Sequence, residues 1–329
     1  MPIDIYSVAQ PDTTTSSISV GQRLLAHVRI LRLDHCIKQV FIFPGVVLAI
    51  AISGRNVDRS LVFNIVIGML AATLISSSNY VLNEMLDAPF DRLHPTKKTR
   101  PAAEGLVHLG WGYAQWIATM AVGVGIASTI SRGFLLSTIG LWLMGCLYNI
   151  PPIRTKDLPY VDVLSESINN PLRFCLGWYM VTATILPPAS LLVSYWMLGA
   201  YFMALKRFSE HRQINDAAIA ISYRRSFLYY NQESLLSSAV FYAVTSMLFL
   251  GAFIMRYRME LILAFPMVAL LMSIYFGLSF RHESAVQNPE KLYREPWLMS
   301  FLILTIVTFA VLLFVDVPWI AEVFVKSHP

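Results

Sequence analysis

Charged residues and cysteines are both scarce in this chain. Asp, Glu, Lys and Arg make up 14% of the 329 residues, whereas 56% are hydrophobic and the mean hydropathy is +0.57. Because soluble domains are about 45–50% apolar, this shortage of charge excludes an ordinary soluble fold. The cysteines Cys36, Cys146 and Cys175 lie in or beside apolar segments without metal-ligand spacing, so we interpret them as small buried hydrophobic residues.

The N-terminal stretch lacks the features of a cleaved signal peptide. Residues 13–17 are a polar run of threonine and serine, and the first 20 residues contain no apolar segment followed by a small-residue cleavage site. We expect a polar tail over residues 1–22 and a single membrane domain over residues 23–329.

Nine apolar segments are each about long enough to cross a bilayer, which takes roughly 20 helical residues. Backbone groups in lipid must be paired within their own segment, so these segments predict helices and not separate strands. The expected fold class is an all-α polytopic membrane protein, with about nine transmembrane helices around a central cavity. The segments are 36–54, 61–82, 111–130, 133–150, 162–186, 188–205, 236–255, 259–279 and 297–315.

Loop charge orients the predicted helices. Most of the 25 Lys and Arg residues fall in loops on one side of the membrane, and positively charged loops mark the cytoplasmic side. The sequence therefore predicts an integral protein of a bacterial inner membrane with a cytoplasmic N-terminus and a cytoplasmic active site.

A first acidic motif ends the second apolar segment. Asn83, Asp87 and Asp91 are four residues apart, so a helix places them on one face. Pro89 should end or kink this helix. Two close carboxylates repel each other unless a proton or a cation lies between them. Oxygen ligands of this kind suit Mg²⁺ that is held together with substrate phosphates.

A second polar stripe lies in the fifth segment. Asp162, Glu166, Asn169 and Arg173 occupy roughly 60° of one helical face. Ionisable residues inside a membrane segment are costly and indicate function. The alternative is that Asp162 or Glu166 simply forms an ion pair with Arg173 or with a loop cation.

Basic residues follow the first acidic motif closely. Arg92, Lys97, Lys98 and Arg100 lie in the next loop. Such a cluster can contact anionic lipid or, beside two carboxylates, neutralise a diphosphate leaving group together with a metal ion. His94 is a general base, a phosphate ligand or a turn residue. Further cations that could reach the same cavity are Lys38, Arg154, Lys156, Lys206 and Arg207.

The two acidic motifs together resemble those of the UbiA-type intramembrane prenyltransferase superfamily. The similarity consists of N-x-x-x-D-x-x-x-D, ending at Asp91, and D-x-x-x-E, ending at Glu166, in a later helix. It implies nine transmembrane helices with Mg²⁺-diphosphate held between the motifs. The catalytic metal ligands that it implies are Asp87, Asp91, Asp162 and Glu166.

Further stretches are similar to the decaprenyl-phosphate phosphoribosyltransferases of this superfamily. They are Asp91-Arg92-x-His94-Pro95-Thr96-Lys97-Lys98-x-Arg100-Pro101, Lys38-Gln39, the spacing of Lys156, Asp162 and Arg173, Lys206-Arg207-Phe208-Ser209-Glu210, and Arg224-Arg225-Ser226. This similarity implies phosphoribosyl pyrophosphate as donor, polyprenyl phosphate as acceptor and a product that feeds lipid-linked arabinose synthesis. NoeC-like rhizobial nodulation proteins are relatives of the same kind. The substrate-binding residues that it implies are Lys38, Asn83, Arg92, Lys97, Lys98, Arg100, Lys156, Arg173, Lys206 and Arg207.

Two other functions stay open. The stretch Tyr148-Asn149-Ile150-Pro151-Pro152 is closer to ordinary prenyltransferases, which transfer a prenyl group from a polyprenyl diphosphate to an aromatic acceptor. A membrane transporter would also carry intramembrane carboxylates, but only one segment is clearly interrupted and no internal repeat is evident. The charge balance favours phosphoribosyl transfer, because its three phosphate-bearing groups require more cations than Mg²⁺ alone supplies. We expect no nucleic-acid partner, and the sequence does not indicate an oligomeric state.

Overall fold

The computed structural model describes the chain except for residues 1–18, 93–96, 214–224, 282–283, 288 and 326–329. Every regular element of the described residues is a helix, which confirms the predicted all-α class. The α-helices are α1 Val20–Arg29, α2 Phe43–Ser53, α3 Arg59–Asp91, α4 Leu109–Ala127, α5 Arg132–Asn149, α6 Val161–Ser167, α7 Asn169–Val181, α8 Ala189–Gln213, α10 Gln232–Tyr257, α11 Phe265–Ser279, α12 Pro296–Phe314 and α13 Pro318–Val325. The 3₁₀ helices are η2 Leu33–Ile42, η3 Thr155–Asp157, η4 Arg225–Leu228, η5 Met259–Ala264, η6 Ala285–Gln287 and η7 Pro289–Arg294.

The membrane-spanning character of the fold follows from helix length and composition. Within the described part of the chain, five helical stretches are long and apolar enough to cross a bilayer: α3, α8, α10, η5 with α11, and α12. A sixth is counted if the bent pair Val20–His35 and Lys38–Ser53 crosses as one span. The fold is therefore an integral membrane bundle, and the predicted total of nine spans stays a prediction.

The start of the bundle differs slightly from the predicted boundary of the polar tail. Ser19 and Gln22 form a capping box in which each side chain pairs with the backbone of the other residue. Because this box satisfies the first free N–H groups of a helix, α1 begins at Val20, inside the predicted tail. Residues 1–18 lie outside the described residues.

Helix α3 positions the first acidic motif. Its N-terminus is capped by Asp58, which accepts a hydrogen bond from the Leu61 N–H at 2.7 Å. Pro89 lies inside the helix, which continues to Asp91. A proline removes one backbone hydrogen bond, and this loss is tolerated because the helix ends only two residues later. Asp91 is therefore the last helical residue, at the mouth of the helix as the sequence predicts.

The polar stripe of the fifth segment falls on two consecutive helices. Helix α6 ends at Ser167 and α7 begins at Asn169, but Ile168 between them keeps a right-handed helical backbone (φ −60°, ψ −20°). Glu166, Asn169 and Arg173 therefore keep approximately the helical phase that the sequence predicts.

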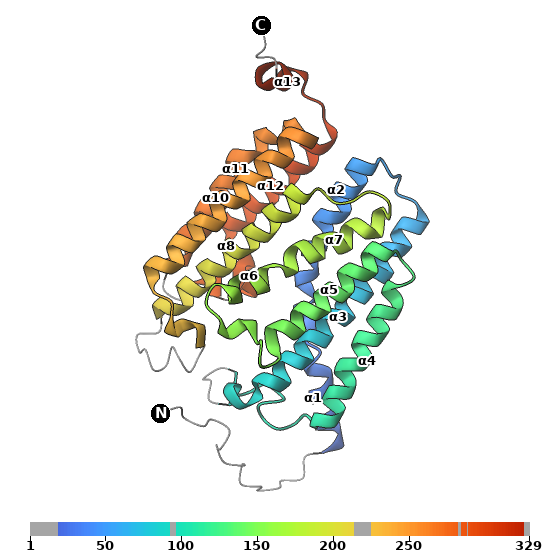
Figure 1. The fold of residues 1–329 in the computed structure, drawn as a ribbon, viewed down its shortest axis with the longest axis vertical. Coiled ribbons are helices and arrows are strands. Elements are labelled where there is room, and N and C mark those ends of the chain that lie inside the picture. Colours follow the sequence, from blue (N-terminus) through green and yellow to red (C-terminus); the bar gives the residue numbers. More distant parts are fainter. Residues whose placement is uncertain (1–18, 93–96, 214–224, 282–283, 288, 326–329) are drawn as a thin grey trace.

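Helix α7 lies at the centre of the bundle, between α2, α5 and α8 (Figure 1). It touches α2 through glycines: a Cβ atom on Gly45 would collide with the carbonyl oxygen of Phe174, and one on Gly177 with that of Ile42. The two backbones thus meet directly, as small residues permit in membrane helices. This contact holds η2, the segment just before α2, against α7.

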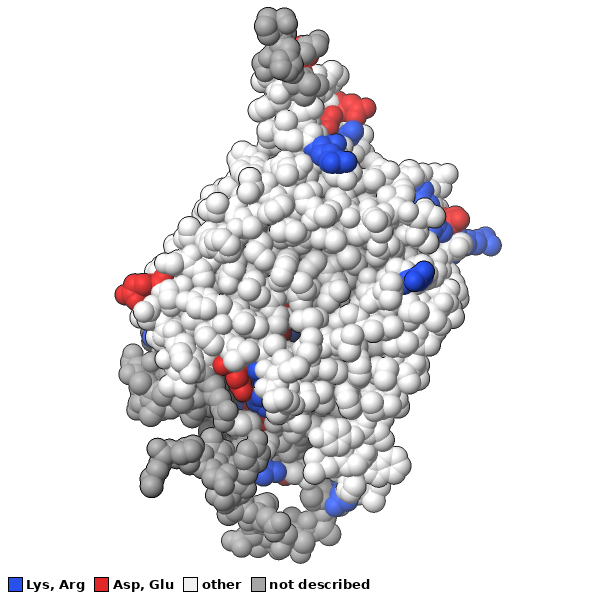
Figure 2. All heavy atoms as spheres, viewed as in Figure 1, with Lys and Arg blue, Asp and Glu red and all other residues white. Residues whose placement is uncertain are grey.

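Charge on the molecular surface falls into two separate groups. On the face drawn in Figure 2, blue and red atoms gather at the top and upper-right edge and again at the lower left and bottom, and the region between the two groups is nearly all white. Large apolar side chains on the spans, such as Phe63, Val244 and Ile303, are exposed. An apolar belt between charged ends is what a bilayer requires.

Candidate active site

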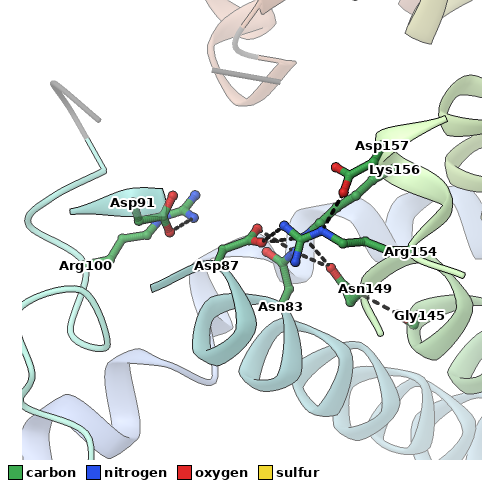
Figure 3. Close-up of polar contacts among 9 residues, drawn as sticks. All are labelled: Asn83, Asp87, Asp91, Arg100, Gly145, Asn149, Arg154, Lys156 and Asp157. Carbon is green, nitrogen blue, oxygen red and sulfur yellow. Dashed lines mark hydrogen bonds and ion pairs between the residues drawn. The ribbon is translucent and has the colours of Figure 1, made fainter. Parts of the chain in front are cut away.

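Asp87 is the centre of a network that joins α3 to the segment between α5 and α6. Its Oδ1 accepts hydrogen bonds from Lys156 Nζ at 2.6 Å and Arg154 Nη2 at 2.9 Å, and its Oδ2 accepts one from Asn83 Nδ2 at 3.1 Å. Asn149 completes the network, because its Oδ1 accepts from both Asn83 Nδ2 at 2.6 Å and Lys156 Nζ at 2.9 Å (Figure 3). One carboxylate thus balances two cations.

Asp91 forms a second, adjacent ion pair. Arg100 Nη1 donates to its Oδ2 at 2.7 Å (Figure 3). Lys97 lies near enough to both Asp87 and Asp91 to interact with them electrostatically. The predicted basic loop therefore does return to the first acidic motif.

Two side-chain contacts hold the backbone of the loop after α3. The carboxylate of Glu84 accepts a hydrogen bond from the Ala102 N–H at 3.3 Å, and Arg92 Nε donates to the Ala103 carbonyl oxygen at 3.0 Å. Arg92 therefore supports the loop backbone in this structure. Lys98 is exposed, and His94 lies outside the described residues.

Asp162 anchors a separate buried cluster. Its side chain is fully buried and accepts hydrogen bonds from Arg207 Nε at 3.1 Å, Tyr230 Oη at 2.6 Å and Ser226 Oγ at 3.4 Å. Arg207 also donates to Glu210 at 2.8 Å. Burial raises the pKa of the Tyr230 phenol above its ordinary value, and the Asp162 carboxylate raises it further. Tyr230 therefore stays a neutral donor to Asp162.

Tyr148 lies between the two clusters. The Lys156 ammonium is 5.9 Å from the centre of its ring, and Arg207 lies within electrostatic reach of the same residue. The Asp87 network and the Asp162 cluster are thus neighbours across one aromatic side chain.

The oxygen donors of the first motif fit Mg²⁺, although the two acidic motifs stay apart. Among the described residues, no three His, Cys, Asp or Glu side chains are grouped so that they could hold a metal ion. Mg²⁺ usually takes only one or two protein carboxylates and completes its shell with water and substrate phosphates. Asp87 and Asp91, with Asn83 beside them, supply that donor set.

The remaining predicted site residues differ in their surroundings. Lys38 Nζ is 5.7 Å from the centre of the Tyr80 ring, and Lys206 is 4.0 Å from Glu210. Among the described residues, Glu166 makes no hydrogen bond or ion pair, and Arg173 Nε is buried without a hydrogen-bond partner. Arg224 lies outside the described residues.

The sequence-based prediction missed three residues that bond to predicted site residues. Asn149, Glu210 and Tyr230 have no assigned role in the sequence, yet each bonds to a predicted residue. Glu210 follows Arg207 by three residues, which places the two on one helical face, so its spacing was a usable signal. Asn149 and Tyr230 reach their partners across 66 and 68 residues, and no local pattern indicates such contacts.

Hollows lie beside α6 and α7, the helices of the fifth predicted segment. One, of about 750 Å³, lies between α6, α8 and α10 and is lined mainly by apolar groups such as Leu164, Trp196 and Phe241. Another, of about 390 Å³, lies between α5 and α7. The predicted central cavity stays a prediction.

Comparison with known proteins gives a consistent result. Residues 41–302 match the model of the UbiA prenyltransferase family. A decaprenyl-phosphate phosphoribosyltransferase of Corynebacterium glutamicum is 26% identical over 193 residues, which are 56% of this chain and 54% of that protein. A protoheme IX farnesyltransferase of Bacillus pumilus is 23% identical over 186 residues, which are 55% of this chain and 60% of that protein.

A solved structure shares the fold. The structure of a UbiA homologue from Archaeoglobus fulgidus bound to GPP and Mg²⁺ matches with a TM-score of 0.64 and 18% identity, over 87% of this chain and 99% of that chain. The chain spans little more than half the length of the two relatives above.

Proposed function

The chain belongs to the UbiA prenyltransferase family, and on that premise we propose that it is a Mg²⁺-dependent transferase that moves a phosphoribosyl group from phosphoribosyl pyrophosphate to a polyprenyl phosphate. The observation that carries the proposal is the density of cations at the first acidic motif. Arg100, Arg154 and Lys156 contact its two carboxylates directly. A donor and an acceptor that both carry phosphate need this supply of charge.

Mg²⁺ would be held by Asp87 and Asp91, with Asn83 in support, and would neutralise the departing diphosphate. The cations that pair with these carboxylates in the structure would be near a diphosphate held by the same metal ion. Arg154 and Lys156 on one side and Arg100 with Lys97 on the other would bind the diphosphate or the 5-phosphate of the donor. Guanidinium groups suit this task because they bind phosphate through two parallel hydrogen bonds.

The reaction forms one bond to the ribose anomeric carbon and breaks another. The bond to the pyrophosphate oxygen breaks with its electron pair leaving on the pyrophosphate, and an oxygen of the lipid phosphate attacks. Positive charge develops on the ribose between these events, and nearby carboxylates such as Asp87 would stabilise it electrostatically. Lys38, at the start of the bundle, would hold the lipid phosphate while the polyprenyl tail lies between helices in the bilayer. The product would feed lipid-linked arabinose synthesis, as in a nodulation pathway.

Prenyl transfer to an aromatic acceptor is the second candidate. The likeness to a farnesyltransferase supports it, as does the Tyr148-Asn149 stretch, whose asparagine binds Lys156. Only one diphosphate would then enter the site, which leaves several of the cations without a phosphate partner.

Membranes containing the protein should transfer label from radiolabelled phosphoribosyl pyrophosphate to a polyprenyl phosphate in the presence of Mg²⁺. Asp87→Asn and Asp91→Asn should each lower the rate by at least about 100-fold, because each removes a carboxylate that holds the metal. Asp316→Asn is the matched control, since Asp316 lies at the opposite end of the bundle beside Arg258. This variant should transfer label at the wild-type rate.

Two outcomes would count against the proposal in different ways. Near-normal transfer by Asp87→Asn or Asp91→Asn would remove the metal assignment. No lipid label from folded wild-type protein would move the donor to a prenyl diphosphate.

A further inference from the structure

Three buried polar atoms without a partner among the described residues lie on η2 and α7, two elements that pack against each other. Gln39 on η2 is 3% exposed and donates through Nε2 to the Ala72 carbonyl oxygen and to Ser76 Oγ. Its Oε1 accepts no hydrogen bond from the described residues. Arg173 Nε and Asn169 Oδ1, both on α7, are also buried without a described partner. Few buried polar atoms in native proteins lack a partner, so these three require an explanation.

The packing of α7 directs Arg173 toward η2. Gly177 lies one turn after Arg173 on the same helical face, and it packs against Ile42 at the end of η2. Tyr195 gives a second indication of where Arg173 lies. The Tyr195 hydroxyl donates to the Phe41 carbonyl oxygen at 3.3 Å, and Arg173 lies within electrostatic reach of the same tyrosine. Arg173 is thus close to the chain segment that carries Gln39.

This junction lies deeper in the bundle than the first acidic motif. Gln39 binds Ser76, which precedes Asn83 by seven residues on the same face of α3. At 1.5 Å of rise per residue, the Gln39–Ser76 contact is about 10 Å from Asn83 along the helix. The part of a donor that extends inward from its diphosphate would arrive at this depth.

The polarity of the junction discriminates between two kinds of donor. An isoprenoid chain would leave Arg173 Nε and the two amide oxygens desolvated and without a hydrogen bond, which is strongly unfavourable. A phosphorylated sugar offers an anion to the guanidinium and hydroxyl donors to the oxygens of Gln39 and Asn169. Glu166 lies one turn before Asn169 and could accept a further hydroxyl.

We propose that the η2–α7 junction is the donor-specificity site, in which Arg173 binds the phosphate of a phosphorylated sugar while Gln39 and Asn169 bind its hydroxyls. The inference rests on the proposed function and assigns its selectivity to particular residues. Sites built to hydrogen-bond a substrate reject an apolar analogue by orders of magnitude, so the junction selects against prenyl diphosphates.

Direct binding to the full-length protein in lipid nanodiscs tests this assignment without turnover. Ribose 5-phosphate, inorganic pyrophosphate and geranyl diphosphate are the probes, each titrated by calorimetry. Arg173→Leu should weaken ribose 5-phosphate binding by about 10- to 100-fold, the effect of losing a charged hydrogen bond, and should leave pyrophosphate binding unchanged. Asn169→Ala should weaken ribose 5-phosphate binding by a smaller factor. Arg132→Leu, which alters an exposed arginine at the start of α5, is the control and should bind all probes as the wild type does.

The results distinguish a failure of the specificity site from a failure of the proposed reaction. Equal ribose 5-phosphate affinity in wild type, Arg173→Leu and Asn169→Ala would overturn the junction as the specificity site and leave the proposed reaction standing. A wild type that binds geranyl diphosphate more tightly than pyrophosphate and does not bind ribose 5-phosphate would overturn both. Retained pyrophosphate binding shows that each variant is folded.

Discussion

At the scale of single residues, Asp162 illustrates how a buried carboxylate is stabilised by protein groups alone. Arg207, Ser226 and Tyr230 occupy its two oxygens, and a buried ion without such partners would be very costly. These contacts favour a positioning role for Asp162, in which it holds the segment after α8 against α6. Its predicted role as a metal ligand would require it to exchange these partners.

Tyr230→Phe should destabilise the protein by about 1–3 kcal/mol, because Asp162 would lose a buried hydrogen bond of 2.6 Å. The raised pKa of Tyr230 sets the pH dependence. A group whose pKa is raised on folding contributes stability that is fully present below its unfolded pKa, about 10 for tyrosine, and that is lost only as the pH rises through the higher folded value.

Thermal unfolding in detergent between about pH 6 and pH 9 checks both statements. The loss of stability of Tyr230→Phe relative to the wild type should be constant across that range. Tyr229→Phe is the matched control, because Tyr229 is 68% exposed, and it should match the wild type. A deficit that disappears by about pH 8 would contradict the assigned hydrogen bond.

Residue spacing predicted part of the site and could not predict the rest. The four-residue spacing of Asn83, Asp87 and Asp91 indicates a shared helical face, and the structure shows Asn83 bonded to Asp87. Which cations reach each carboxylate depends on contacts across the chain: Lys156 meets Asp87 over 69 residues and Arg207 meets Asp162 over 45. Local patterns carry no information on such pairings.

At the scale of helices, the close approach of α2 and α7 determines where the N-terminal segment lies. Because Gly45 and Gly177 leave no room for a side chain, the two helices and the adjoining η2 have one packing arrangement. The sequence predicts the helices themselves from their apolar length. It cannot predict that each of these glycines faces the backbone of the opposing segment, since that depends on the rotation of both helices.

Gly45→Ala and Gly177→Ala should each destabilise the fold by about 1–3 kcal/mol or more, because the added methyl group meets backbone atoms that cannot move aside easily. Binding of ribose 5-phosphate should weaken in parallel as η2 moves away from α7. Gly251→Ala is the control, since nothing lies within 4 Å of its Cβ position, and it should be neutral or slightly stabilising. The midpoint of thermal unfolding in detergent measures the stability of all three variants. Midpoints of Gly45→Ala and Gly177→Ala equal to that of the wild type would contradict the tight contact.

At the scale of the whole molecule, charge and apolar surface define how the bundle lies in a membrane. The charged atoms form two groups separated by a nearly uncharged region (Figure 2), and the Asp87 network lies at the end of α3 where most of the basic loops are predicted. Composition alone predicts a membrane protein of this class. The number of spans depends on how short and bent helices such as α6 with α7 are placed in the bilayer, which composition does not determine.

The predicted orientation can be tested with cysteine labelling in intact bacterial cells, using a background in which the three native cysteines are replaced by alanine. Arg132→Cys, at the start of α5, should react with a membrane-impermeant maleimide from outside. Lys98→Cys, beside the first acidic motif, should react only after lysis. Both positions are exposed, so access to each depends on the side of the membrane, and the reverse pattern would contradict the cytoplasmic placement of the site.

The identity of the transferred group is the central claim, and product analysis tests it most directly. Purified protein in nanodiscs that contain a polyprenyl phosphate would receive phosphoribosyl pyrophosphate, geranylgeranyl diphosphate and Mg²⁺ together, and mass spectrometry would identify the lipid product. We predict that the lipid phosphate gains a phosphoribosyl group while the prenyl diphosphate remains intact. Consumption of the prenyl diphosphate with phosphoribosyl pyrophosphate left unchanged would contradict the account.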